Sequence, residues 1–359
     1  HTAYRRQRQM CIRDRLIMEV ERIDSMRLSI HDLMTYKDGE TPEEVYDRTR
    51  QFVQEIDKLH YTRYWFAEHH NTTYYASVSP ELIATHMSAL TDNLRLGTGG
   101  TMIMHYSPLK IAENVRTMDA LAPGRADIGL GRAPGAGPNE ILALAEGQSQ
   151  TFDDLYNKVQ VILDYLSDEK PERFYGRTEA APKGLSQLPQ PWMLGSSGQS
   201  ATKTAELGLG YSFAKFFGIE TDPDIFKLYR SNFKPSVFFD KPEIIVSYMI
   251  IVADTEEEAF YHFKPVIMNL MSIRAGKMIP IYHPDQVKDY EFSQEEQAFV
   301  DRYLDKRFAV VGSKDQVKEI LEDEVDKLGI DEIMAYSPIY DDQARVDSYR
   351  KLAEIFDLV

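Results

Sequence analysis

Two adjacent histidines with a carboxylate beside them, Glu68, His69 and His70, end an apolar run that is typical of a strand. Histidine is the side chain that most readily gives or takes a proton near neutral pH. A metal site is the alternative, but neighbouring strand residues point to opposite faces, and the chain has no HExxH motif. The segment therefore predicts His69 as a proton-transfer or cofactor-contacting residue, His70 turned toward packing or an interface, and no metal.

A second candidate segment is rich in glycine. Residues 96–101 read Leu-Gly-Thr-Gly-Gly-Thr at the end of another apolar run. Glycine weakens a strand unless the backbone must approach a ligand closely or take unusual torsions. We predict that Gly99 and Gly100 lie against a ligand; a simple bulge at the strand end is the alternative.

Two further segments could hold a phosphate. Arg132 stands among glycines after the run 126–131, and a guanidinium group matches the geometry of phosphate. Ser196, Ser197 and Gly198 precede a predicted helix, whose first N–H groups attract anions. An ordinary surface arginine and ordinary serine capping are the alternatives. Together the two segments favour a phosphate-bearing cofactor, and the absence of a Gly-x-Ser-x-Gly motif argues against a serine hydrolase.

The elements that must position these residues alternate between short strand-like runs and longer amphipathic runs. Eight such repeats predict an α/β protein with a closed (β/α)8 TIM barrel, in which the strand C-termini meet at one catalytic rim. No Gly-x-Gly-x-x-Gly motif follows the first run, which argues against a dinucleotide-binding half-domain. We predict strands at 28–32, 64–68, 94–104, 126–131, 192–195, 210–214, 244–252 and 332–336. We predict helices at 45–59, 80–90, 109–121, 152–166, 201–207, 224–233, 255–271, 314–328 and 344–356.

The chain divides into a leader and a single domain. Residues 1–15 carry five arginines and one aspartate, and no apolar core of a secretory signal. We interpret residues 1–25 as a non-native or disordered leader and residues 27–359 as one barrel domain. Residues 274–307 exceed the usual loop length and form a predicted lid-like insertion before the last strand–helix unit; a surface helical excursion is the alternative.

Composition narrows the class of protein. The 359 residues contain 41 Lys+Arg and 57 Asp+Glu, a net charge of −16, so we predict no nucleic-acid partner. The apolar runs are far shorter than the ~20 residues of a membrane helix. The one cysteine cannot form an internal disulfide. We expect a soluble, cytoplasmic protein.

Taken in order, these segments make the chain resemble the bacterial luciferase-like family of flavin-dependent monooxygenases, from about residue 27 to 359. The motifs that carry the resemblance are YWFAEHHN at 64–71, LGTGG at 96–100, MDALAPGR at 118–125, GLGRAPG at 129–135 and LGSSG at 194–198.

The resemblance implies a TIM barrel that uses reduced FMN, supplied by a separate reductase, and O2 to oxidise a small organic substrate through a flavin C4a-(hydro)peroxide. It implies that Arg132 and Ser197, with the backbone of 196–198, hold the FMN phosphate. It implies a cis Gly99–Gly100 peptide under the flavin ring, and His69 in the flavin chemistry. Glu68 would lie at the contact of a homodimer built from the helices at 79–90 and 108–121.

Two other functions remain open on this fold. One is a deazaflavin-dependent hydride-transfer enzyme, which would not use O2. The other is a flavin-binding protein without catalysis. Luciferase itself carries a reactive cysteine near the fourth strand, and this chain has none there, so we do not expect light emission.

Overall fold

The computed structural model describes residues 26–148, 152–277 and 279–359. The predicted leader at 1–25 lies outside the described residues. None of the described helices is long and apolar enough to cross a membrane.

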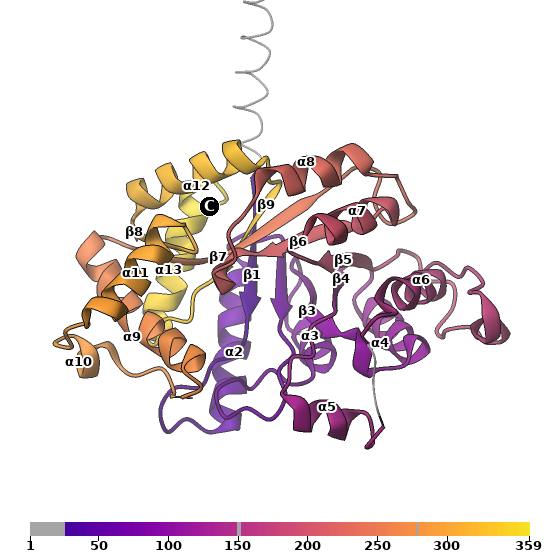
Figure 1. The fold of residues 1–359 in the computed structure, drawn as a ribbon, viewed down its shortest axis with the longest axis horizontal. Coiled ribbons are helices and arrows are strands. Elements are labelled where there is room, and N and C mark those ends of the chain that lie inside the picture. The colour runs from indigo at the N-terminus through magenta and orange to yellow at the C-terminus, as the bar shows by residue number, and fades with distance from the viewer. Residues whose placement is uncertain (1–25, 149–151, 278) are drawn as a thin grey trace, which may run out of the picture.

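Eight parallel strands close into a barrel, which confirms the predicted (β/α)8 architecture (Figure 1). Each strand of the ring is hydrogen-bonded to the next, and β9 closes the ring by pairing with both β1 and β7. The ring consists of β1 (Arg27–Asp32), β2 (Arg63–Phe66), β3 (Arg95–Met102), β4 (Ala126–Gly131), β5 (Gln190–Leu194), β6 (Gly210–Ala214), β7 (Ile244–Ala253) and β9 (Glu332–Tyr336).

A ninth strand, β8 (Ala309–Ser313), was missed by the sequence prediction and lies outside the ring. It pairs only with the second half of β7, at Met249–Ala253, whereas the first half of β7 pairs with β9. The long, fully buried strand β7 therefore serves both the barrel and this outer pair.

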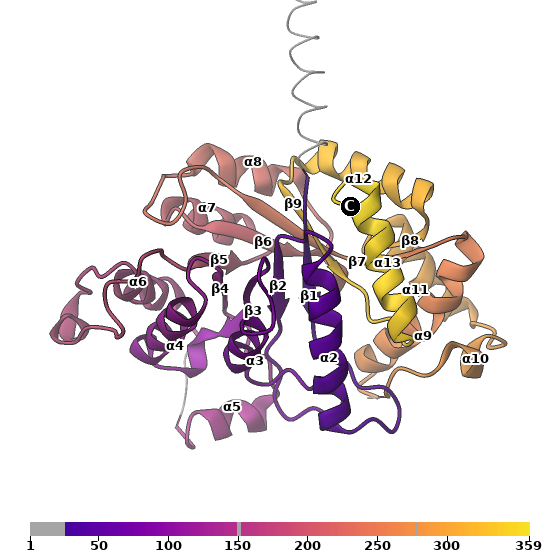
Figure 2. The same ribbon diagram turned by 180° about the vertical axis from the view of Figure 1, so that it is seen from behind.

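Helices surround the barrel on its outer side (Figures 1 and 2). Several begin with a proline in the first turn, and Thr41 caps the first described helix through the backbone N–H of Glu44. The long helices are α2 (Pro42–Asp57), α3 (Pro80–Ser88), α4 (Pro108–Leu121), α6 (Leu155–Leu166), α7 (Gly198–Glu206), α8 (Pro223–Asn232), α9 (Glu256–Arg274), α11 (Gln294–Asp305), α12 (Lys314–Leu328) and α13 (Asp342–Ile355). Two shorter ones are α5 (Pro138–Leu144) and α10 (Pro284–Val287).

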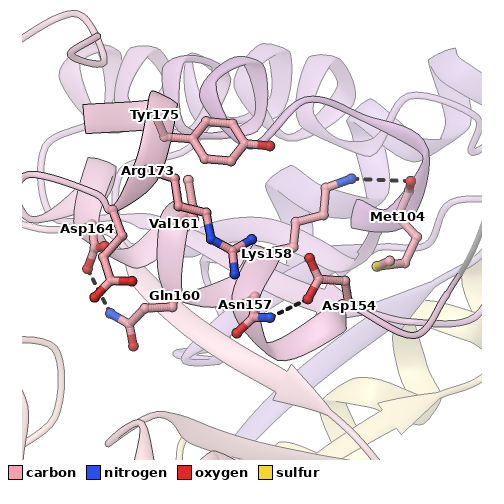
Figure 3. Close-up of a pocket in the computed structure, with 10 residues that line it drawn as sticks. Met104, Asp154, Asn157, Lys158, Gln160, Val161, Asp164, Arg173 and Tyr175 are labelled. Atoms are coloured by element: carbon pink, nitrogen blue, oxygen red, sulfur yellow. Dashed lines mark hydrogen bonds between the residues drawn. The ribbon is translucent and has the colours of Figure 1, made fainter. Parts of the chain in front are cut away.

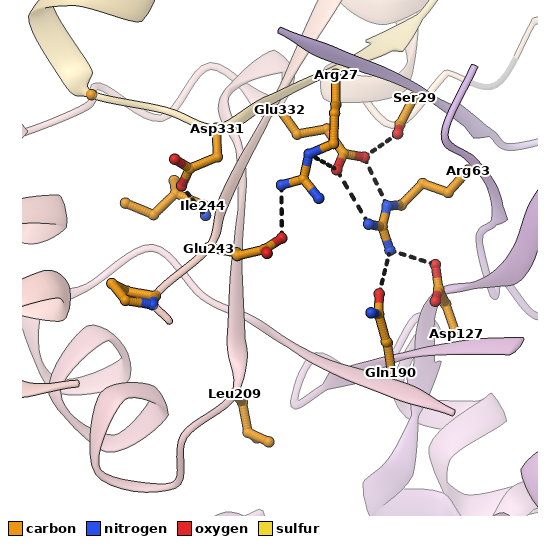
Figure 4. A network of polar contacts seen from close by, with 12 residues as sticks. Arg27, Ser29, Arg63, Asp127, Gln190, Leu209, Glu243, Ile244, Asp331 and Glu332 are labelled. Atoms are coloured by element: carbon orange, nitrogen blue, oxygen red, sulfur yellow. Dashed lines mark hydrogen bonds and ion pairs between the residues drawn. The ribbon is translucent and has the colours of Figure 1, made fainter. Parts of the chain in front are cut away.

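The N-terminal end of the barrel is closed by a buried ionic network (Figure 4). Arg63 lies 2.7 Å from both Asp127 and Glu332, and Gln190 accepts a further bond of 3.3 Å. Above this network, the side chains of Trp65, Trp192, Ile245 and Met334 form an apolar cluster. With the lower part of the barrel filled in this way, a ligand can enter only from the C-terminal rim.

The insertion at 274–307 contacts the loops that follow β1 and β9, where Ile281 bridges to Lys37 and the ring of His283 lies 5.1 Å from that of Tyr340. Its role as a lid stays a prediction. Its described residues contain α10 and α11 and lead into β8, and none of them lines the cavity described below. The apolar part of the rim comes instead from the turn after β6, where Phe216, Phe217 and Ile219 line the cavity.

Candidate functional site

A cavity of about 460 Å³ opens at the C-terminal ends of the barrel strands. Pockets that bind cofactors and small molecules are typically of this size and largely apolar. The cavity brings together six of the seven site residues predicted from the sequence: His69, Gly99, Gly100, Arg132, Ser196 and Ser197. The seventh, Gly198, begins α7 directly after Ser197.

The end of β3 forms one wall of the cavity. The Gly99–Gly100 peptide is cis, as predicted, and the register with β4 shifts between Thr98 and Thr101. A Cβ atom at Gly100 would lie 2.4 Å from Leu194 Cδ1 and 2.7 Å from the carbonyl oxygen of Gly129. The bulge that was the alternative thus occurs at the same two glycines that line the cavity. Their contact with a ligand stays a prediction.

The segments after β4 and β5 place Arg132, Ser196 and Ser197 at the cavity. Arg132 is exposed and makes no hydrogen bond or ion pair with another described residue. Ser197 is the N-cap of α7 and accepts a hydrogen bond from the backbone N–H of Ser200. The N-terminus of α7 and a guanidinium that has no partner among the described residues thus line one cavity. Both kinds of group attract anions.

His69 lines the cavity just beyond the end of β2. Its backbone N–H donates to Ser77, and its ring lies 4.8 Å from that of Tyr75. Burial lowers the pKa of His69 to about 4, with a smaller contribution from His31. The Nδ1 atom has no hydrogen-bond partner in the described part of the chain. At neutral pH the ring is therefore neutral.

Glu68 and His70, the neighbours of His69 in sequence, bind each other. His70 Nε2 lies 2.8 Å from Glu68 Oε1, which also accepts from the Tyr106 hydroxyl at 2.6 Å. The other carboxylate oxygen accepts from the backbone N–H of Met102 at 2.7 Å. His70 thus takes the packing role predicted for it, and Glu68 joins β2 to the end of β3.

Other cavity residues were not predicted. His31 lies near the end of β1, and its Nε2 is 2.5 Å from the Gly99 carbonyl oxygen. Ser212 on β6 and Ser247 on β7 are almost fully buried cavity residues. The sequence could have indicated these three residues only through their positions, because each is a polar residue within a predicted strand.

A second hollow, of about 270 Å³, lies between α6 and the 3-10 turn Arg173–Arg177 (Figure 3). Several of the polar side chains that line this hollow are hydrogen-bonded to groups around it. Lys158 donates to the Met104 carbonyl oxygen at 3.2 Å, and Gln160 donates to Asp164 at 2.7 Å. Burial lowers the pKa of Lys158 to about 8. We therefore place the functional site in the barrel cavity.

Comparison with known proteins identifies the family. The family model described as luciferase-like monooxygenase matches residues 26–332. The chain belongs to the luciferase-like monooxygenase family. It is 37% identical to YwcH of Bacillus subtilis over 335 residues, which cover 92% of this chain and 98% of that protein. It is 34% identical to a luciferase-like monooxygenase of Escherichia coli K12 over 331 residues, which cover 92% and 97%.

Solved structures support the same fold. The structure of apo-MsnO8 superposes with a TM-score of 0.81 at 29% identity, covering 94% of this chain and 99% of that chain. More distant neighbours share the fold with different cofactors. The oxygenating constituent of 3,6-diketocamphane monooxygenase in complex with FMN has a TM-score of 0.67 at 16% identity. A coenzyme F420-dependent tetrahydromethanopterin reductase from Methanopyrus kandleri has a TM-score of 0.59 at 14% identity.

Among relatives with a named activity, an N-acetyl-S-alkylcysteine monooxygenase of B. subtilis is 27% identical over 332 residues. The oxygenase component of a trigonelline monooxygenase of Acinetobacter baylyi is 24% identical over 294 residues. Membership of the luciferase-like monooxygenase family supports a flavin-dependent oxidoreductase activity for this chain. In the described residues, no three His, Cys, Asp or Glu side chains are grouped so that they could hold a metal ion.

Proposed function

We propose that this chain is an FMN-dependent monooxygenase that uses reduced FMN and O2 to oxidise a small organic substrate. The observation that carries the proposal is that Arg132 and the N-terminus of α7 line the same cavity as His69. A phosphate held at the first two would leave the rest of the cavity for the flavin ring, beside the histidine.

The residues present fit FMN. Arg132 has no partner in the described chain, and a terminal phosphate dianion would supply one. The wall at Gly99 and Gly100 carries no side chain, so a planar ring can lie against the backbone. The floor contains Trp65 and Met334, which offer apolar surface to an aromatic ring.

Bound reduced FMN supplies the electrons that activate O2, and the protein supplies position, a dry environment and proton control. Arg132, Ser196 and Ser197 would hold the phosphate of FMN. Phe216 and Phe217 keep water from the inner cavity. His69, neutral because its pKa is about 4, holds or transfers a proton at the cavity wall.

The cavity also indicates the kind of substrate. Its charged side chains are Glu68, whose oxygens are already hydrogen-bonded, and Arg132, which we assign to the phosphate. The inner wall offers two neutral histidine rings, two serine hydroxyls and apolar side chains. A charged substrate would lack a partner there, and burying an unpaired charge is costly. We therefore expect an uncharged substrate with a largely apolar body.

We further propose that a separate reductase supplies reduced FMN in the cytoplasm.

We also propose that the enzyme works as a homodimer. Helices α3 and α4 lie side by side, joined by a bond of 3.3 Å from Asn114 to Glu81. Each exposes a leucine, Leu82 and Leu121, at 69% and 66%. Ile83 and Met87 of α3 are buried in the core, so only part of the apolar surface of this helix is available for an interface.

The reaction of the FMN-loaded protein with O2 tests the proposal. The protein is loaded anaerobically with reduced FMN, mixed with O2, and followed by flavin absorbance in stopped flow. We expect a reoxidation phase distinct from that of free reduced FMN. If the protein instead binds reduced F420 and leaves it unreactive toward O2, the deazaflavin function replaces this one. If FMN binds but reoxidises as it does in free solution, the protein is a flavin binder without catalysis.

A further inference from the structure

His31 is a second histidine of the cavity, and it is 6% exposed. Its Nε2 lies 2.5 Å from the carbonyl oxygen of Gly99. A carbonyl oxygen only accepts hydrogen bonds, so Nε2 carries the proton and donates it. Burial, which outweighs the opposing effects of Gly99 and Asp32, lowers the pKa of His31. The neutral ring therefore has its lone pair on Nδ1.

Packing alone does not account for a histidine at this position. Nδ1 is buried and has no hydrogen-bond partner among the described residues. The neighbouring carboxylate of Asp32 is engaged by Arg345 at 3.0 Å and by the backbone N–H of Met34 at 2.8 Å. The ring otherwise packs against Phe216, 5.4 Å between centroids. A phenylalanine would make that contact without burying an unpaired nitrogen.

The bond to Gly99 is thus the polar contact that a histidine adds here. Gly99 is tightly enclosed, because a Cβ atom on it would lie 2.9 Å from Trp65 Cβ and 3.0 Å from His31 Cδ2. The His31 ring therefore both abuts the glycine and holds its carbonyl oxygen. We propose that His31 is a positioning residue of the flavin site, whose Nε2–H bond to Gly99 fixes the orientation of the Gly99–Gly100 peptide in the cavity wall.

This inference rests on the proposed function, because it assumes that the wall faces bound FMN. The test compares His31→Phe, which keeps the ring, with His31→Gln, whose amide nitrogen can replace Nε2 as a donor. Loss of one neutral hydrogen bond should lower FMN affinity by roughly two- to tenfold in His31→Phe. The visible absorption band of the bound flavin should shift toward that of free FMN. His31→Gln should restore both.

FMN binding by the wild-type protein separates the proposed function from the proposed role of His31. If the wild-type protein binds no FMN, the proposed function fails. If it binds FMN and His31→Phe has the same affinity and spectrum, only the role of His31 is wrong. The role is equally wrong if His31→Gln is as impaired as His31→Phe. Should His31→Phe not fold, His31→Asn takes its place, since its shorter amide does not reach the position of Nε2; we expect it to behave as the phenylalanine variant. His60→Gln, at an exposed position between α2 and β2, is the matched surface control.

Discussion

At the scale of single residues, the two adjacent histidines have separate tasks. His69 lines the cavity, whereas His70 is bonded to Glu68. Positioned acid–base groups contribute ~10²–10⁴ in rate. His69→Ala should therefore lower O2-dependent turnover by that order while changing FMN affinity less than about twofold. His70→Ala should lower the melting temperature more than turnover. Stopped-flow traces and thermal unfolding of both variants check this, and the reverse pattern would mean that the roles are exchanged.

The low pKa of His69 also predicts how stability depends on pH. The unfolded histidine titrates at about 6.5, and the folded one at about 4, so the unfolded state binds more protons between these values. The stability contributed by the neutral ring is complete above pH 6.5 and is lost as the pH falls through 4. We expect the loss to be on the order of 1–3 kcal/mol. Chemical denaturation of wild type and His69→Gln across this range measures it. Identical pH profiles would contradict the prediction.

The sequence revealed some of these residues and not others, for physical reasons. His69, Arg132 and Ser197 stand in glycine- or serine-rich strand ends, where their type is informative. His31 is a single histidine in an apolar strand, and its importance depends on Gly99, which lies 68 residues away in sequence. The partners of Glu68 could not be predicted for the same reason, since Met102 and Tyr106 belong to a later segment.

At the scale of elements, the strand ends carry the site, and the glycines there differ in the space around them. Gly100 has no room for a Cβ atom, whereas one at Gly198 would make an ordinary contact of 3.6 Å with Leu228. Gly100→Ala should destabilise the protein by roughly 1–3 kcal/mol through overpacking and disturb flavin binding. Gly198→Ala is the matched control and should leave the free energy of unfolding nearly unchanged. Equal effects in denaturant titrations would contradict this assignment.

Most helices and strands of the barrel could be predicted from the sequence, because each one has its own local pattern of apolar residues. The bounds of β4, β6 and β9 agree with the prediction. The outer strand β8 was missed because it has only five residues and lies directly between α11 and α12. Nothing local shows that β7 continues past the ring to pair with it. The lid function of 274–307 stays a prediction, since the length of a segment does not determine whether it closes over a cavity.

At the scale of the whole molecule, we predict a homodimer that forms through α3 and α4. Leu82 and Leu121 expose apolar surface on adjacent helices, and such patches often mark interfaces. Light scattering at micromolar concentration should give the mass of a dimer for the wild type. The double change Leu82→Glu and Leu121→Glu should give the monomer mass. Leu142→Glu, at an exposed leucine of α5, is the control and should remain dimeric. A monomeric wild type would refute the interface.

The most direct test of the central claim is the affinity of the protein for FMN compared with riboflavin, which has the same ring but no phosphate. If Arg132 and the N-terminus of α7 hold the phosphate, the loss of a charge-assisted contact costs ~1.5–3 kcal/mol. Wild type should then bind FMN roughly ten- to a hundredfold more tightly than riboflavin. Arg132→Ala should lose most of this preference without weakening riboflavin binding. Equal affinities for FMN and riboflavin in the wild-type protein, or an unchanged preference in Arg132→Ala, would contradict the assignment of the site.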